Sequence, residues 1–304
     1  MRDLLKRIRR ANPPPFPSML AQAARAAYAR NAEVLDLPRA PLARVEELAL
    51  PASDGTRLNA RLYAATRERS PVLLYLHGGG FTIGSTDTHD SLCRQLAASS
   101  GAAVVSLNYR LAPEHRFPTA VDDAWAGMAW LRDEGESLGL DRSRLAVGGD
   151  SAGGTLAAVC ALHARDLGLP LALQLLITPG TAANQDSASH RAYGEGFLLD
   201  AETVRWFFAH YIDAEDQRDW RFAPMNADDL ERVAPACMVL AECDPLVDEG
   251  VAYADRLRMA GVAVELEIFR GVTHDFIKMG RALPEALTAQ AMAAQALKKA
   301  FDDA

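Results

Sequence analysis

Residues 149–153, with the sequence Gly-Asp-Ser-Ala-Gly, constrain the fold of this chain more than any other segment. They follow an apolar run, residues 145–147, that predicts a short buried strand, and they precede an alanine-rich run, residues 155–162, that predicts a buried helix. The pattern Gly-x-Ser-x-Gly is typical of a serine on a sharp strand-to-helix turn. Because the backbone of such a serine is strained, the residues two positions away must lack side chains that would collide. Glycine is common enough for the bare pattern to arise by chance, so its context decides what it means.

Composition excludes several classes of protein. The 304 residues suffice for a sizeable core, and 49% of them are hydrophobic, as in ordinary globular proteins. The net charge of -8 and the absence of a long basic block argue against nucleic-acid binding. The basic N-terminus runs into three prolines at residues 13–15 rather than an apolar core, and no run approaches a membrane span, so we expect a cytoplasmic protein. The four cysteines lack metal-binding spacing, which indicates free thiols.

The hydrophobic pattern predicts an α/β fold. Residues 45–50 and 57–63 partly alternate around a turn at 53–55, which indicates a β-hairpin, and residues 71–76 form a fully apolar strand. Beyond them, helices are expected over 89–100, 119–133, 247–260 and 283–301, and strands over 102–107, 145–148, 171–177, 236–241 and 262–269. Short apolar strands between amphipathic helices predict a mostly parallel twisted sheet with helices on both faces.

Two segments lie outside this alternation. Residues 18–37 are expected to form an accessory helix, with Ser18 as its N-cap and Pro38 beyond its end. Residues 180–221 are too long for a simple connection and predict a helical insertion, with a helix over 201–211 capped by Asp200. The aromatic residues of this insertion fit either core packing or the wall of a substrate pocket. We therefore divide the chain into an N-terminal cap segment (1–43), a core (44–179), a cap insertion (180–221) and the rest of the core (222–304).

If Ser151 is a nucleophile, it needs donors for a developing oxyanion. Residues 77–80, His-Gly-Gly-Gly, follow a buried strand at the edge of the sheet where the active site is expected. Three glycines leave the backbone N–H groups unshielded, and neither of the usual phosphate-binding patterns is present. We expect the N–H groups of Gly78, Gly79 and Ala152 to form an oxyanion hole, against the plain alternative of a glycine-rich turn.

The nucleophile also needs a base and a group that orients the base. Of the seven histidines, only His274 follows a predicted core strand, where it can overhang the carboxyl end of the sheet. The candidate for the orienting acid is Asp244, because it ends the strand over 236–241 and Pro245 then starts a helix. Glu242 is the runner-up. The order Ser151, Asp244, His274 is the order of the α/β-hydrolase architecture.

Four motifs together carry a resemblance to a known family. They are HGGGF at residues 77–81, NYRLAPE at 108–114, GDSAGG at 149–154 and DPLVDEG at 244–250. The chain thereby resembles the bacterial hormone-sensitive-lipase-like carboxylesterases, from about residue 48 to its last helix. The resemblance implies an α/β-hydrolase core with a helical cap, no cofactor or metal, and a triad of Ser151, Asp244 and His274. It also implies hydrolysis of short- to medium-chain carboxylic esters.

Two positions depart from the family pattern. Asp275 stands where glycine usually follows the catalytic histidine, and it tolerates a positive φ better than most residues do. Asp275 is also an alternative orienting group for the imidazole. Thr178 stands where an aromatic residue is more usual. The expected reaction is ester hydrolysis through an acyl-enzyme; the alternatives are lactonase, amidase or acyltransferase chemistry on the same triad, or a non-catalytic small-molecule receptor. A small-molecule ester is the expected partner, and a homodimer is left open.

Overall fold

A single eight-stranded sheet forms the centre of the computed structural model, which describes residues 1–304. The strands follow one another across the sheet in the order β1-β2-β4-β3-β5-β6-β7-β8. Their bounds are β1 Arg44–Pro51, β2 Arg57–Ala64, β3 Ser70–Leu76, β4 Ala103–Asn108, β5 Leu140–Asp150, β6 Gln174–Ile177, β7 Ala236–Cys243 and β8 Val264–Thr273. β2 is antiparallel to β1 and to β4, and every other neighbouring pair is parallel. The predicted hairpin and the mostly parallel sheet are therefore confirmed.

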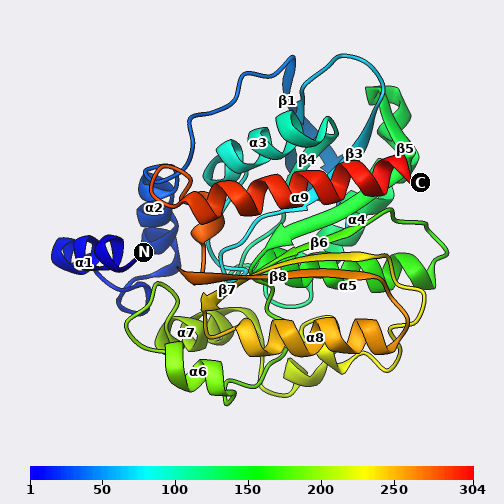
Figure 1. Ribbon diagram of the computed structural model, residues 1–304. Coiled ribbons are helices and arrows are strands. Elements are labelled where there is room, and N and C mark those ends of the chain that lie inside the picture. Colours follow the sequence, from blue (N-terminus) through cyan, green and yellow to red (C-terminus); the bar gives the residue numbers. More distant parts are fainter.

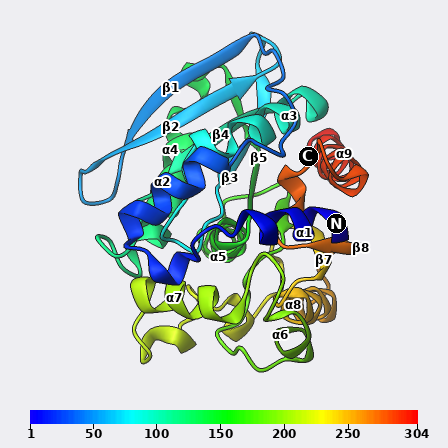
Figure 2. The same ribbon diagram turned by 90° about the vertical axis from the view of Figure 1, so that its left-hand side faces the viewer.

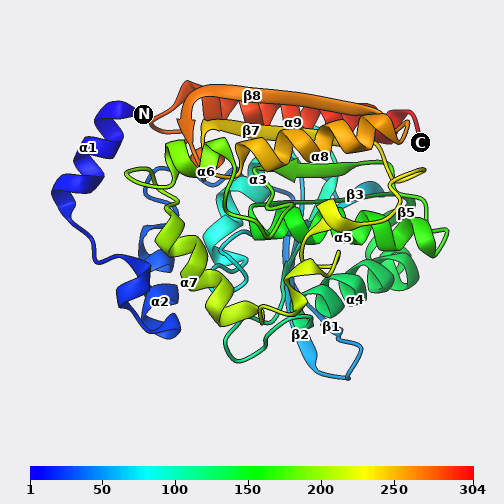
Figure 3. The ribbon, with the colours of Figure 1, turned by 90° about the horizontal axis from the view of Figure 1, so that it is seen from below.

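Helices cover both faces of the sheet (Figure 1). α3 (Asp90–Ser100) and α9 (Pro284–Asp302) pack on one face, and α4 (Thr119–Glu134), α5 (Ala152–Asp166) and α8 (Val247–Met259) pack on the other. Figure 3, seen from below, shows α8, α5 and α4 in front of the strands. β3 is apolar throughout because both of its faces are buried. Leu74 and Leu76 belong to the core cluster on one face of the sheet, and Leu73 and Tyr75 belong to the cluster on the other.

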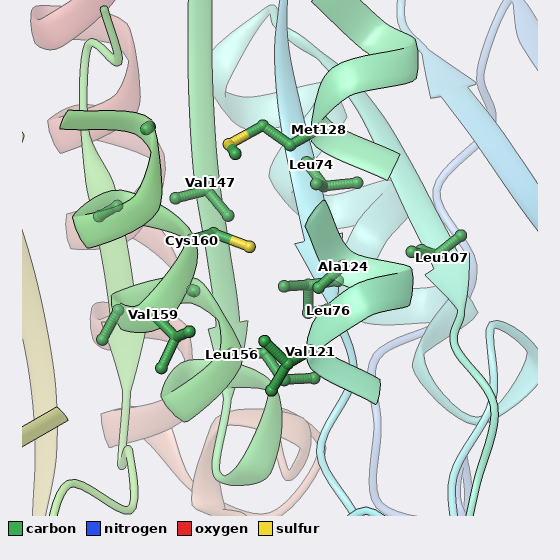
Figure 4. Close-up of a cluster of buried hydrophobic side chains, with 14 of the residues drawn as sticks. Leu74, Leu76, Leu107, Val121, Ala124, Met128, Val147, Leu156, Val159 and Cys160 are labelled. Carbon is green, nitrogen blue, oxygen red and sulfur yellow. The ribbon is translucent and has the colours of Figure 1, made fainter. Parts of the chain in front are cut away.

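The packing of α4 and α5 fixes the helix that begins beside Ser151. Figure 4 shows Leu76 of β3 and Val147 of β5 among side chains from α4 and α5, including Val121 and Leu156. All four residues are 0% exposed, and each buried side chain of this kind contributes about 1.5–3 kcal/mol. The start of α5 therefore has little freedom to move. Cys160 is buried in the same cluster, and all four cysteines are free thiols.

The remaining helices lie at the carboxyl ends of the parallel strands (Figure 2). They are α1 (Arg2–Ala11), α2 (Ala21–Asn31), α6 (Ala188–Tyr193) and α7 (Ala201–Tyr211). α2 and α7 come from opposite parts of the chain, yet Tyr28 and Phe207 line one cavity together with Ser151. No helix in the structure has the length and apolar character needed to cross a membrane.

The prediction for the N-terminal helix was wrong in its bounds. The helix runs over Ala21–Asn31 rather than 18–37, and Ser18 does not cap it. Ser18 instead ends a short 3-10 turn, where its hydroxyl donates to the carbonyl oxygen of Pro15 at 2.7 Å. α1, which was not predicted, precedes it and buries no residue. Prolines thus divide this region into two helices where the sequence had suggested one.

The other elements agree with the predictions to within about two residues, except for three strands, and β6 begins at Gln174 rather than at residue 171. α7 has the predicted bounds, and the side chain of Asp200 caps it by accepting a hydrogen bond from the N–H group of Thr203. β5 is longer than the predicted 145–148, because it begins at Leu140 and continues past an irregularity in its pairing with β3. β8 likewise extends to Thr273, which places its end next to His274.

Candidate active site

Ser151 occupies the strained turn that its sequence motif predicts. Its φ of 54° lies in the left-handed region, which non-glycine residues rarely adopt. A Cβ atom on Gly149 would lie 2.3 Å from the carbonyl oxygen of Leu76, and one on Gly153 would lie 1.9 Å from the same oxygen. Both distances are impossible, so both glycines are required by the close approach of β3. The turn holds the serine at the carboxyl end of β5 and at the N-terminus of α5.

Three predicted residues come together at this edge of the sheet. Ser151 Oγ lies 2.9 Å from His274 Nε2, and His274 Nδ1 lies 2.7 Å from Asp244 Oδ2. Asp244 follows β7 and is 1% exposed, while His274 follows β8 and is 6% exposed. Both distances suit strong hydrogen bonds, and the chain of contacts from carboxylate to imidazole to hydroxyl is continuous. This arrangement can transfer a proton from Ser151 to His274.

The environment of His274 favours its protonated form. Burial alone would lower the pKa of His274, since it penalises the charged ring. The charge of Asp244 and its hydrogen bond outweigh burial, and the pKa of His274 is raised to about 9. The imidazolium that forms when the ring accepts a proton is therefore stabilised at the place where the reaction needs it.

The other acidic candidates have different partners. Glu242, the runner-up, accepts a hydrogen bond from the backbone N–H group of Gly271 at 2.7 Å. Asp275 lies 3.7 Å from the ammonium of Lys278, and its second neighbour is the hydroxyl of Tyr28 on α2, at 3.5 Å. Neither carboxylate contacts the imidazole ring by a hydrogen bond. Asp275 does adopt a positive φ, 65°, as expected where glycine is usual.

The glycine-rich loop differs from the prediction at Gly78. Its N–H group donates to Asp150 Oδ1 at 3.1 Å, so it is already occupied and cannot serve the oxyanion in this arrangement. The N–H groups of Gly79, Gly80 and Ala152 have no acceptor within the protein. Gly79 and Gly80 also line a cavity together with Ser151 and His274, which Gly78 does not. Gly80, which was not among the predicted donors, is therefore a further candidate, and the third glycine of the motif was the signal for it.

Asp150 explains why Gly78 is occupied. Its buried carboxylate also accepts from the hydroxyl of Tyr75 at 2.6 Å and lies 3.2 Å from His89 Nε2. Burial by itself would raise the pKa of Asp150, but the charge and hydrogen bond of His89 outweigh burial and hold that pKa below its ordinary range. An ionised acceptor forms strong hydrogen bonds, so Asp150 fixes the start of the glycine loop.

Two cavities meet at Ser151. The phenylalanine-lined cavity lies between the core and the insertion, and its wall includes Phe81, Ala152, His190, Leu199, Val204, Phe207, Phe208, Phe222, Leu246 and Glu249. The histidine-side cavity is bounded by Phe16, Tyr28, Gly79, Ile83, Leu198, Thr203, His274 and Asp275. Gly80, Leu199 and Phe207 belong to both. Of the aromatic residues of the insertion, Phe207 and Phe208 line a cavity, whereas Tyr211 is buried in the core, so each of the two alternatives left open by the sequence holds for part of the set.

The sheet order and a serine on the turn between β5 and α5 define the class of protein as an α/β-hydrolase. The model of the α/β-hydrolase fold family matches residues 73–278. An ethyl acetate hydrolase of Pseudomonas putida is 45% identical over 263 residues, 84% of this chain and 82% of the relative. A carboxylesterase of Mycobacterium tuberculosis is 40% identical over 269 residues, 86% of this chain and 84% of the relative.

Solved structures agree with the sequence relatives. An ester hydrolase from the metagenome of Lake Arreo has a TM-score of 0.95 and 38% identity, covering 99% of this chain and 98% of that one. A hyperthermophilic esterase of the archaeon Pyrobaculum calidifontis has a TM-score of 0.93 and 37% identity, covering 98% of this chain and 96% of the other. The chain belongs to the α/β-hydrolase family, among the hormone-sensitive-lipase-like carboxylesterases, and is a carboxylic ester hydrolase. The resemblance stated from its motifs is confirmed.

Proposed function

We propose that this enzyme hydrolyses short- to medium-chain carboxylic esters through an acyl-enzyme, with Ser151 as nucleophile, His274 as base and Asp244 as the group that orients His274. The observation that carries the proposal is the continuous chain of two hydrogen bonds, 2.9 Å and 2.7 Å long, that joins these three side chains. Serine hydroxyls are weak nucleophiles at neutral pH, and an adjacent imidazole activates them by taking the proton.

Acylation begins when Ser151 Oγ attacks the ester carbonyl and His274 Nε2 takes its proton. The carbonyl oxygen then carries negative charge, which the N–H groups of Gly79, Gly80 and Ala152 stabilise. Gly80 replaces Gly78 in this proposal, because the N–H group of Gly78 is bound to Asp150. Each such donor typically contributes about 2.7–4 kcal/mol to the transition state. The N-terminus of α5 adds the favourable field of its dipole.

The two cavities receive different halves of the ester. His274 must protonate the leaving alcohol, so the alcohol occupies the histidine-side cavity, whose wall includes His274. The acyl group then occupies the phenylalanine-lined cavity, which lacks His274. Water enters after the alcohol has left, His274 takes a proton from it, and the acid is released. Through His274, one proton passes from Ser151 to the leaving alcohol and one passes from water back to Ser151, so the enzyme returns to its starting state.

The N-terminal segment (1–43) and the insertion (180–221) act as a cap over this site. Support comes from Phe16 and Tyr28 of the first segment and from Leu199 and Phe207 of the second, which all line the cavities at Ser151. The relative named an ethyl acetate hydrolase, 45% identical, supports a preference for small acyl groups. The bulky side chains around the phenylalanine-lined cavity support the same preference.

Hydrolysis of p-nitrophenyl esters from acetate to palmitate, with an amide analogue, tests the proposal. We expect kcat/KM to be highest for the shorter acyl groups and the amide to be a poor substrate. A fluorophosphonate probe should also label Ser151, as located by mass spectrometry. Absence of both labelling and turnover would favour a receptor, and a preference for palmitate would contradict the proposed acyl range.

A further inference from the structure

Two buried polar side chains lie in the wall of the phenylalanine-lined cavity. His190 of α6 is 6% exposed and Glu249 of α8 is 7% exposed, and both share the cavity with Ser151. Most of their neighbours in this wall are apolar, among them Val204 and Leu246. Buried polar groups nearly always have hydrogen-bond partners, so a polar pair in such a wall calls for a physical reason.

Each of the two side chains is fixed at one end and free at the other. His190 Nδ1 lies 2.7 Å from Ser187 Oγ, whereas His190 Nε2 is buried without any partner. Glu249 Oε1 accepts from the N–H groups of Thr181 at 2.6 Å and Ala182 at 3.1 Å. Glu249 Oε1 therefore has a structural role, as the acceptor of these two backbone hydrogen bonds. They leave Glu249 Oε2 and His190 Nε2 facing each other at 3.9 Å, too far for a hydrogen bond.

The 3.9 Å gap suits one bridging oxygen atom. An oxygen atom placed between them can lie roughly 2.8 Å from both His190 Nε2 and Glu249 Oε2, which is the length of a hydrogen bond. A hydroxyl group can both donate and accept, so it satisfies either tautomer of His190 while bonding Glu249. A carboxylate or an ammonium group would place a charge in this mostly apolar wall, which is costly.

Burial also keeps the pair uncharged near neutral pH. It raises the pKa of Glu249 to about 8 and lowers the pKa of His190. A protonated carboxyl donates and a neutral imidazole accepts, which again matches a group with one donor and one acceptor. The geometry and the protonation states therefore select the same ligand chemistry.

We propose that His190 and Glu249 form a hydroxyl-binding subsite of the acyl cavity, so that the enzyme prefers esters whose acyl chain carries a hydroxyl group away from the carbonyl. This inference rests on the proposed function, because it assigns the acyl group to the phenylalanine-lined cavity. The substrate class is the esters of ω-hydroxy acids. A plain acyl chain leaves the pair without its third partner, and the resulting desolvation penalty reduces the binding of that chain.

The test compares kcat/KM for ethyl 6-hydroxyhexanoate and ethyl hexanoate. A second pair, ethyl 8-hydroxyoctanoate and ethyl octanoate, varies the distance between the hydroxyl group and the ester carbonyl. We expect the wild-type enzyme to prefer the hydroxy ester by about tenfold for at least one chain length. His190→Phe keeps a planar ring but removes both nitrogens, so this ratio should fall to about one. His190→Gln keeps a polar end and should retain part of the preference.

Val204→Ala serves as the matched control, since Val204 lines the same cavity from α7 but offers no hydrogen bond. It should change the two rates by a similar factor and leave their ratio near the wild-type value. A wild-type ratio of one or below at both chain lengths would overturn the subsite, even if no variant folded. A preference that survives in His190→Phe would overturn it as well. Failure to hydrolyse any ester would instead refute the proposed function, which fluorophosphonate labelling of Ser151 detects independently.

Discussion

Replacing Asp244 by asparagine tests how the carboxylate acts on His274. Asparagine has nearly the same size and can still accept the N–H group of Leu246, which Asp244 Oδ1 does at 3.0 Å. The change removes the charge that lies 2.7 Å from His274 Nδ1 in a buried site. The difference between the pKa of about 9 and the ordinary value of 6.5 corresponds to roughly 3 kcal/mol of stabilisation of the charged ring.

The sign of the pH effect follows from the role of the base. His274 accepts a proton only when it is neutral, so kcat/KM falls as the pH drops below its pKa. In the wild-type enzyme this acid limb should lie near the pKa of about 9. In Asp244→Asn burial is opposed only by the weaker effects of the Asp275 and Asp150 charges, so the acid limb should move to lower pH. The maximal rate should also fall by about 10⁴, because the ring loses the partner that fixes its tautomer.

The assay is kcat/KM for p-nitrophenyl butyrate between about pH 5 and 10, with the rate of the uncatalysed reaction subtracted. Glu242→Gln is the matched control, since Glu242 ends the same strand but bonds Gly271 instead. The control should leave the acid limb in place. An unmoved limb in Asp244→Asn, or a moved limb in Glu242→Gln, would refute this explanation of the pKa of His274.

Two further substitutions test the framework of the site. Gly153→Ala should lower the free energy of unfolding in urea by about 3 kcal/mol, because its Cβ would lie 1.9 Å from the carbonyl oxygen of Leu76. An unchanged unfolding midpoint would contradict the close approach of β3. Arg110→Ala should cost about 3–5 kcal/mol, because it leaves the carboxylate of Asp123, 0% exposed, without the guanidinium at 2.6 Å. Arg132→Ala, at a far more exposed pair, should cost less than about 1 kcal/mol, and equal losses at the two arginines would contradict the argument from burial.

The core and the three candidate catalytic residues were predictable because local chemistry specifies them. Gly149 and Gly153 are required by a turn that the short motif itself describes, and β3 and β5 are apolar on both faces. Asp244 and His274 each follow a core strand, and the carboxyl ends of parallel strands meet at one edge. Proximity in space therefore followed from position in the chain.

The details that the sequence did not predict depend on distant contacts. The N–H group of Gly78 is occupied because Asp150 points toward it, and Asp150 is held by Tyr75 and His89 from other elements. Similarly, His190 lines the phenylalanine-lined cavity only because α6 packs beside α8, and the hydroxyl of Ser189 donates to the carbonyl oxygen of Pro245, just before α8, at 2.7 Å. Neither contact leaves a periodic pattern in the sequence.

The N-terminal helices show a different limit of sequence patterns. The region predicted as one helix forms a 3-10 turn followed by α2, and Leu20 at its N-cap is 83% exposed. An apolar side chain at this position suggested packing that the fold does not provide. α2 is held in place by contacts such as the one from Arg25 Nε to the carbonyl oxygen of Thr82 at 2.8 Å, which joins the helix to the glycine loop.

We infer that Ser151 is the nucleophile of this ester hydrolase. The most direct measurement is kcat for p-nitrophenyl butyrate in purified Ser151→Ala, compared with the wild-type enzyme at the same pH. We expect a decrease on the order of 10⁶, with the thermal stability retained. Ester hydrolysis that persisted at a comparable rate in Ser151→Ala would contradict it.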